Sequence, residues 1–308
     1  MVLRFLQKTL ALALLVGPQT ASQVPRFSTG SNLVVLSATA VDKHGRPVSG
    51  LTAKDFRVLE DGRPQPVVHF ALGREASARI LLLVDASGSM NGELKAASSK
   101  MAALQILSAL DPEDEAALAG FDQKYWGVVK FTKDRQQVSD GFAELQPFGS
   151  TALHDALDHA ASDLASHGEG RRAVVVITDG VDTASQKTPE EVIAHSKALD
   201  VPIYAISVLS PLDDPQSPLF AGHQRPAAAT AGSAVLARYA ELSGGAAFVV
   251  SDFGGLKQAA TQVVSELKQQ YRLGYEQPPG PSRFRRIEVR STRKGVLVRT
   301  RSGYVPQS

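Results

Sequence analysis

Residues 79–89 read Arg-Ile-Leu-Leu-Leu-Val-Asp-Ala-Ser-Gly-Ser, an apolar run that ends in small and polar residues. Its apolar part, Ile80 to Val84, shows no alternation of polar and apolar residues, which is typical of a strand covered on both faces. A second run of this kind, Ala173 to Ile177, is followed by Thr178, Asp179 and Gly180. The two runs therefore predict a parallel sheet with helices on both of its faces.

Helical and strand-like segments alternate around these two runs. Thr188-Pro189-Glu190-Glu191, for example, has the cap, the first-turn proline and the acidic third position of a helix start. The alternation predicts an α/β fold with a doubly wound, mainly parallel sheet. The expected helices span 93–110, 152–165, 188–199, 234–242 and 256–270, and the further strands span 116–121, 126–131, 201–208 and 246–250.

Both ends of the chain have a different pattern, with short strands and turn signals such as Asp61-Gly62. Neither end has enough apolar residues to close a core alone, so we expect one small flanking β domain formed by both ends. The expected strands span 33–41, 56–60, 66–70, 271–275, 286–290 and 296–301. The predicted organisation is a signal peptide (1–22), the first part of the β domain (23–76), the α/β domain (77–270) and a C-terminal β segment (271–308).

Polar side chains follow the predicted buried strands at the points where the strands end. Asp85, Ser87 and Ser89 follow the first strand, Asp179 follows the second, and Thr151 opens the helix between them. Ligands of open α/β sheets bind beyond the carboxyl ends of the strands, so these five residues are expected to converge. Taken one at a time, Ser89 and Thr151 also fit helix caps, and Asp179-Gly180 fits a turn. Together they form a set of hard oxygen donors, which suits Mg²⁺, Mn²⁺ or Ca²⁺ and does not suit zinc or copper.

The pattern Asp85-x-Ser87-x-Ser89, a distant Thr151 and a later Asp179-Gly180 resembles the von Willebrand factor type A domain with its metal-ion-dependent adhesion site. The resemblance covers roughly residues 77–270. The segments Asp55 to Gly62 and Tyr271 to Tyr275 look like those of an exported bacterial subgroup of these proteins. The resemblance implies a non-enzymatic module that binds a protein partner through Mg²⁺, or Mn²⁺ or Ca²⁺, with an Asp or Glu of the partner completing the coordination.

Two other functions remain open at this stage. An Asp at a strand end with Mg²⁺ also fits a phosphohydrolase with an aspartyl nucleophile. Haloacid-dehalogenase-type enzymes have a second Asp two residues later, where this chain has Ser87. The third possibility is a scaffold acting through the basic segment 271–308, which carries nine basic residues against Glu276 and Glu288.

The N-terminus has the pattern of an export signal. Arg4 and Lys8 precede the apolar stretch Thr9 to Val16, and small residues at 20–22 offer a cleavage site. No apolar run approaches the roughly 20 residues that span a bilayer. With 33 basic and 31 acidic residues, the chain has no global charge that would recruit nucleic acid, and it has no cysteine. We expect an exported protein, periplasmic or extracellular, with no transmembrane segment in the mature chain.

A long proline-containing segment, Ser210 to Ser233, follows the predicted strand 201–208. Its composition predicts a loop, and loops of this length inside a compact domain are commonly functional. The strand before it ends at the same edge as Asp85 and Asp179. The loop is therefore expected to lie at the metal face and to contribute to partner binding.

Overall fold

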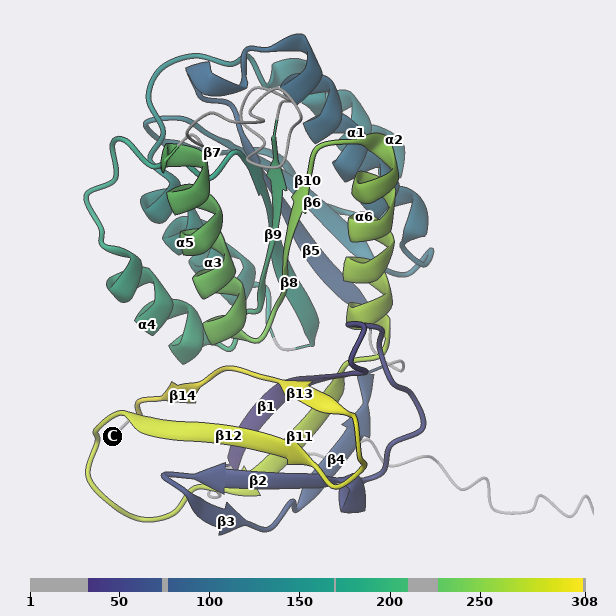
Figure 1. The fold of residues 1–308 in the computed structure, drawn as a ribbon, viewed down its shortest axis with the longest axis vertical. Coiled ribbons are helices and arrows are strands. Elements are labelled where there is room, and N and C mark those ends of the chain that lie inside the picture. The colour runs from purple at the N-terminus through teal and green to yellow at the C-terminus, as the bar shows by residue number, and fades with distance from the viewer. Residues whose placement is uncertain (1–32, 74–76, 169, 210–226, 307–308) are drawn as a thin grey trace, which may run out of the picture. The chain divides into compact units, whose positions relative to one another are not determined.

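The computed structural model describes residues 33–73, 77–168, 170–209 and 227–306, and its centre is a six-stranded sheet in the order β10-β9-β8-β5-β6-β7 (Figure 1). Strand β5 pairs in parallel with both β6 and β8, and only β7, at one edge, runs antiparallel. The predicted doubly wound, mainly parallel sheet is confirmed. Its strands are β5 (Ala78–Asp85), β6 (Glu115–Phe121), β7 (Tyr125–Thr132), β8 (Arg171–Thr178), β9 (Ile203–Val208) and β10 (Ala247–Val250).

Helices cover both faces of this sheet (Figure 1). Ile80 and Leu82 pack toward α1, α2 and α6, whereas Leu81 and Leu83 pack toward α3, α4 and α5. Successive side chains of a strand point to opposite faces, so an unbroken apolar run contributes side chains to the hydrophobic core on each face of the sheet. The helices are α1 (Glu93–Ala109), α2 (Arg135–Asp140), α3 (Leu153–Ser166), α4 (Pro189–Leu199), α5 (Ala227–Ser243) and α6 (Phe253–Lys268).

Two antiparallel sheets join the two ends of the chain. One has the order β13-β1-β11-β4 and the other β14-β12-β2-β3, so each contains strands from both ends. Their shared core includes the buried rings of Phe56, Tyr271 and Tyr275. The expected flanking β structure built from both chain ends is thereby confirmed. Its strands are β1 (Leu33–Val41), β2 (Phe56–Glu60), β3 (Arg63–Gln65), β4 (His69–Leu72), β11 (Tyr271–Glu276), β12 (Arg285–Ser291), β13 (Leu297–Arg299) and β14 (Gly303–Tyr304).

The expected strand over 66–70 is correct only for residues 69 and 70, because β3 (Arg63–Gln65) and β4 (His69–Leu72) lie on either side of residues 66–68. Asp61 and Gly62 both have positive φ, as a two-residue hairpin loop of type I′ requires, and this turn pairs Glu60 directly with Arg63. Strand β3 therefore ends at Gln65, and the chain crosses to the other sheet to form β4.

The expected loop from Ser210 to Ser233 is also wrong in its last part, because α5 begins at Ala227. Alanine has the highest intrinsic helix propensity, and residues 227–229 are three alanines that follow Pro226. Residues 210–226 lie outside the described residues, as does the predicted signal peptide. Among the described residues, no helix combines the length and apolar character needed to span a bilayer.

A buried charged cluster ties the two ends of the chain together. Glu60 of β2 accepts hydrogen bonds from Arg285 Nη1 at 2.8 Å, from the Tyr275 hydroxyl at 2.5 Å and from the Tyr304 hydroxyl at 3.0 Å. The Glu60 and Arg285 side chains are each only 5% exposed. Burial of the Tyr275 hydroxyl, together with its bond to Glu60, raises the tyrosine's pKa. This carboxylate therefore links one strand of the N-terminal part to three of the C-terminal part.

Replacing Glu60 by alanine should lower the free energy of unfolding by about 3–5 kcal/mol, because it leaves the Arg285 guanidinium buried without its counter-charge. Glu288 offers a matched control, since its pair with Arg290 lies at the surface, with side chains 42% and 63% exposed. Glu288→Ala should cost about 0–1 kcal/mol. Urea unfolding of both variants measures the difference. Equal losses would show that the buried cluster does not join the two ends.

Candidate metal centre

The predicted donor residues lie at the carboxyl edge of the central sheet. Asp85 is the last residue of β5, Asp179 directly follows β8, and Thr151 lies two residues before α3. Ser87 and Ser89 lie in the β5–α1 connection, where residues 88–90 form a single 3₁₀ turn. Strand order and chain direction thus bring all five residues to one edge.

Asp85 is buried and hydrogen-bonded through both of its carboxylate oxygens. Its side chain accepts from the Ser87 backbone N–H at 2.8 Å and from Thr178 Oγ1 at 2.5 Å. The residue is 3% exposed. Burial raises the pKa of Asp85 to about 6, against the opposing effect of these hydrogen bonds, and the nearby negative charge of Asp179 adds to the rise. Burial therefore disfavours the charged form of Asp85, and a cation bound nearby would stabilise it.

Backbone hydrogen bonds hold the β5–α1 connection against the segment that leads to Thr151. The Gly88 N–H donates to the Gly149 carbonyl at 2.9 Å, and the Phe148 N–H donates to the Ala86 carbonyl at 2.8 Å. The Ser87 and Ser89 hydroxyl oxygens are 3.1 Å apart. Ser87 is fully buried, whereas Ser89 is exposed, so this pair of hydroxyls runs from the interior to the surface.

Thr151 is fixed by the loop that follows β8. Its backbone N–H donates to Thr183 Oγ1 at 2.9 Å, and its carbonyl accepts from the backbone N–H groups of Thr183 at 2.8 Å and Ala184 at 3.0 Å. Thr151 is 4% exposed. The loop after β8, which carries Asp179, thus also sets the position of Thr151.

A lysine of α1 lies against Asp179. Lys95 Nζ donates to Asp179 Oδ2 at 3.0 Å, and the two side chains are 12% and 6% exposed. The sequence analysis did not single out Lys95, because its distance of 84 residues from Asp179 leaves no local signal of the pair.

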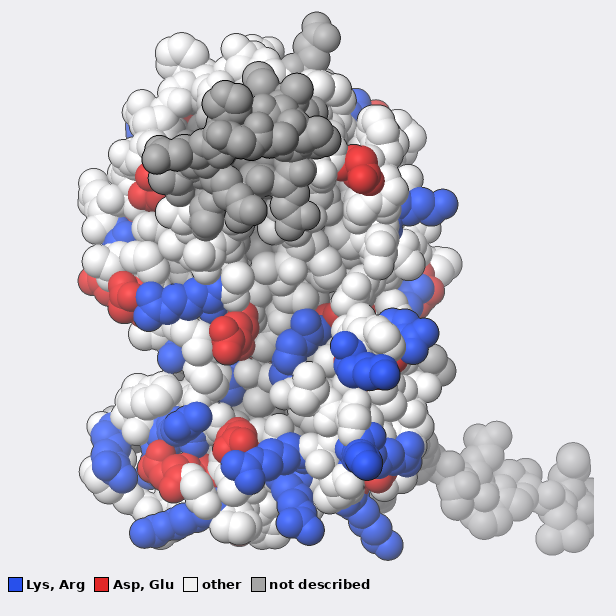
Figure 2. Space-filling model, viewed as in Figure 1, with Lys and Arg blue, Asp and Glu red and all other residues white. Residues whose placement is uncertain are grey.

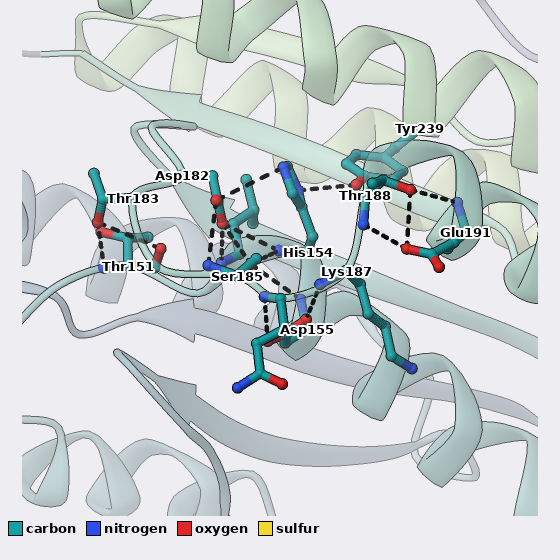
Figure 3. A network of polar contacts seen from close by, with 12 residues as sticks. Thr151, His154, Asp155, Asp182, Thr183, Ser185, Lys187, Thr188, Glu191 and Tyr239 are labelled. Atoms are coloured by element: carbon teal, nitrogen blue, oxygen red, sulfur yellow. Dashed lines mark hydrogen bonds and ion pairs between the residues drawn. The ribbon is translucent and has the colours of Figure 1, made fainter.

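A second polar network lies beside the donor set, around Asp182 and Ser185 (Figure 3). Asp182 Oδ1 accepts from the Leu153 N–H at 2.8 Å and from Ser185 Oγ at 2.6 Å, and Ser185 Oγ accepts from the His154 N–H at 2.9 Å. These side chains satisfy the free N–H groups at the start of α3. Asp182 and Ser185 could not be predicted from the sequence, because a cap that comes from a distant loop leaves no characteristic spacing.

The network continues through His154 to α5. His154 Nδ1 and the Tyr239 hydroxyl are 2.9 Å apart, and burial lowers the pKa of His154. Beside it, Gly180 and Gly232 are in backbone contact: a Cβ added at Gly232 would lie 2.5 Å from the Gly180 carbonyl oxygen. Glycine at both positions is therefore needed to bring α5 against the loop that carries Asp179.

The chemistry of the donor set fits a divalent cation. Within the described ranges no group of three or more His, Cys, Asp or Glu residues could hold a metal. The predicted donor set is of another kind, with two carboxylates and three hydroxyls. Hydroxyl and carboxylate oxygens are ligands of Mg²⁺, Mn²⁺ and Ca²⁺. The ammonium group of Lys95 against Asp179 indicates that this edge attracts positive charge.

The family described as the von Willebrand factor type A domain matches residues 80–181, a range that contains all five donor residues. The chain contains a von Willebrand factor type A domain. A search of curated proteins finds no match to the chain.

Solved structures resemble the fold at low sequence identity. The von Willebrand factor type A protein from Catenulispora acidiphila is 12% identical over 88% of this chain and 73% of its own, with a TM-score of 0.51. Proximal thread matrix protein 1 from the mussel byssus, in a structure with a zinc-occupied MIDAS motif, is 19% identical over 69% of this chain and 50% of its own, with a TM-score of 0.50. These similarities concern the fold alone, and they agree with the type A domain.

Replacing Asp85 by asparagine in metal-free protein should change how stability depends on pH. A carboxyl whose pKa is raised on folding stabilises the fold fully below its unfolded value of 3.8, and this contribution is lost as pH rises through the folded value of about 6. The asparagine variant avoids the loss and should be more stable than the wild type by about 3 kcal/mol at pH 7.5, at ~1.36 kcal/mol per pKa unit. Urea unfolding at several pH values measures this.

The advantage of the Asp85→Asn variant should shrink toward zero near pH 4, where the wild-type carboxyl is protonated in both states. A difference between variant and wild type that stays constant from pH 4 to pH 7.5 would show that Asp85 is not a destabilised buried carboxylate.

Proposed function

We propose that this protein is an interaction module that binds a protein partner through a divalent cation held by Asp85, Ser87, Ser89, Thr151 and Asp179. The observation that carries the proposal is the convergence of these two buried carboxylates and three hydroxyl residues at one sheet edge. A cation held there supplies residual positive charge and exchangeable coordination positions, which an Asp or Glu of the partner can fill.

The residues of the site divide this task between them. Asp85 and Asp179 provide the negative charge that attracts the cation, and Ser87, Ser89 and Thr151 contribute neutral oxygens. Neutral donors leave more of the cation's charge for a partner carboxylate than a third Asp would. We propose Mg²⁺, or Mn²⁺ or Ca²⁺, as the resident ion because all five donors are oxygens. The motif of the mussel protein holds zinc, an ion outside the three proposed here, so it supports a divalent metal at such a site but not the choice of ion.

Three exposed apolar side chains lie on segments at this edge, and they support a protein as the partner. Phe148, three residues before Thr151, is 78% exposed; Leu94, near the start of α1, is 64% exposed; and Phe253, the first residue of α6, is 62% exposed. Exposed apolar residues near a polar centre are typical of protein-binding surfaces. We also propose that the segment 210–226, which follows β9 in the chain, contributes to contact with the partner.

The residues at this edge give little support to a phosphohydrolase. A haloacid-dehalogenase-type enzyme has a second Asp two residues after the nucleophile, and this chain has Ser87 at that position. We therefore propose a module without catalytic activity.

The basic C-terminal segment does not favour a scaffold that recruits polyanions. Figure 2 shows Lys and Arg side chains gathered over the two antiparallel sheets, with acidic side chains among them. Much of this charge is neutralised within the molecule. The pairs are Arg283–Asp61, Arg285–Glu60, Arg290–Glu288, Arg293–Asp55, Arg299–Glu266 and Arg301–Asp200.

The site of action in this proposal is outside the cytoplasm, in the periplasm or beyond the cell. The basis is the sequence pattern of residues 4–22 alone. The domain boundaries given above, at 22, 76 and 270, remain part of the same proposal.

Capture of a partner from envelope extract should depend on both the metal and the donor set. Immobilised protein should retain the partner in Mg²⁺, release it in EDTA and recover it when Mg²⁺ is restored. Asp179→Ala should abolish capture, because it removes one of the two carboxylates that hold the cation. Amidation of the carboxyl groups of the extract should abolish it as well. Quantitative mass spectrometry of the eluates measures these differences.

Asp122→Asn provides the matched control, since Asp122 lies in the β6–β7 turn near the same edge, and its side chain accepts from the Lys124 N–H. This variant should capture the partner as well as the wild type does. A partner that is retained equally in EDTA, or equally by Asp179→Ala, would contradict the proposed function.

A further inference from the structure

Lys95 is the feature of this site that the proposed function leaves unused. Its ammonium group lies 3.0 Å from Asp179 Oδ2, and with 12% of the side chain exposed the pair is largely shielded from water. Shielding strengthens the attraction between opposite charges and also makes an uncompensated charge costly. The pair therefore has to be kept together or replaced by an equivalent one.

The position of Lys95 on its helix supports a role tied to Asp179. Lys95 is the third residue of α1, at the end of the helix where the backbone carries partial positive charge. A cation is disfavoured there, so local helix energetics do not account for the lysine. The Lys95 carbonyl accepts from Ser99 Oγ at 2.9 Å, which leaves the backbone anchored while the side chain is directed at Asp179.

We propose that Lys95 is an exchangeable internal counterion of the metal centre. Without metal, its ammonium group neutralises Asp179 and so limits the repulsion between Asp179 and Asp85. A divalent cation bound to Asp179 takes over this neutralisation, and the ammonium group moves out into solvent. The inference rests on the proposed function, because it needs Asp179 to hold the cation.

The exchange is physically reasonable for a lysine. Its four-carbon stem is flexible and its compact ammonium group is strongly hydrated, so the charged end can swing to the surface while the backbone stays in place. A divalent ion and an ammonium group next to the same carboxylate would repel each other in a poorly screened site. The metal affinity therefore includes the cost of displacing Lys95, which sets the cation concentration at which the module becomes competent to bind.

Calorimetry on the Lys95→Met variant tests the effect on affinity. Methionine keeps most of the stem and removes the charge, so Mg²⁺ should bind at least about tenfold more tightly than to the wild type. Lys124→Met is the matched control, because Lys124 is an exposed lysine in the β6–β7 turn near the same edge. That variant should bind Mg²⁺ within about twofold of wild type, since an exposed charge is screened by solvent.

Chemical labelling of the wild type tests the displacement itself and does not depend on a variant that folds. Acetic anhydride should acetylate Lys95 slowly in metal-free protein and several-fold faster at saturating Mg²⁺, while Lys124 reacts at the same rate in both. Peptide mass spectrometry measures the rates. A Lys95 rate that does not rise with Mg²⁺ would overturn the proposal.

The two experiments separate this inference from the proposed function. If wild type and Lys95→Met bind Mg²⁺ with equal affinity, the counterion role is wrong and the metal-dependent module stands. If neither protein binds Mg²⁺, Mn²⁺ or Ca²⁺, both proposals are wrong. Tighter binding by Lys95→Met together with faster labelling of Lys95 in metal supports both.

Discussion

The arrangement of the carboxyl edge depends on one constraint, the burial of the Asp85 carboxylate at the end of the central strand. A buried ionised group has to be hydrogen-bonded or paired with an opposite charge. Thr178 and the Ser87 backbone provide the hydrogen bonds, and both come from segments that border the site. The same segments carry Ser87 and Asp179, so the hydrogen bonds that satisfy Asp85 also hold these two residues beside it. The strand that forms the core thus ends in the residue around which this part of the site is built.

Charge is used differently in the two parts of the molecule. In the antiparallel sheets, arginines are matched to acidic residues within the fold, as in the Glu60 cluster that joins the two chain ends. At the carboxyl edge, Asp179 is paired with the ammonium group of Lys95, whereas Asp85 is held by hydrogen bonds from Thr178 and the Ser87 backbone. The first arrangement stabilises structure, whereas the second leaves room for an exchange of cations. This contrast is the physical basis for our proposal that a partner binds at the edge of the sheet.

Much of the fold follows from the sequence because strand burial and the alternation of strands and helices are local signals. The runs at Ile80 and Ala173 predicted the two central strands, and chain direction then placed Asp85 and Asp179 at one edge. Contacts between distant segments could not be found in this way. These contacts depend on how the helices pack against the sheet. They are the Lys95–Asp179 pair, the cap that Asp182 supplies to α3 and the Gly180–Gly232 contact. The prolines up to Pro226 predict a loop, but the three alanines that follow them favour a helix, and α5 begins at Ala227.

The central claim, that Asp85, Ser87, Ser89, Thr151 and Asp179 hold one divalent cation, is tested most directly by crystals grown in Mn²⁺. Anomalous diffraction locates manganese without assumptions about its ligands. A manganese ion held by these residues should give a single strong peak at the carboxyl edge of β5 and β8, within about 2.0–2.6 Å of the Ser87 and Ser89 hydroxyl oxygens, the range for hard divalent cations. A fully formed edge with no peak, or a peak only at carboxylates elsewhere in the molecule, would contradict it.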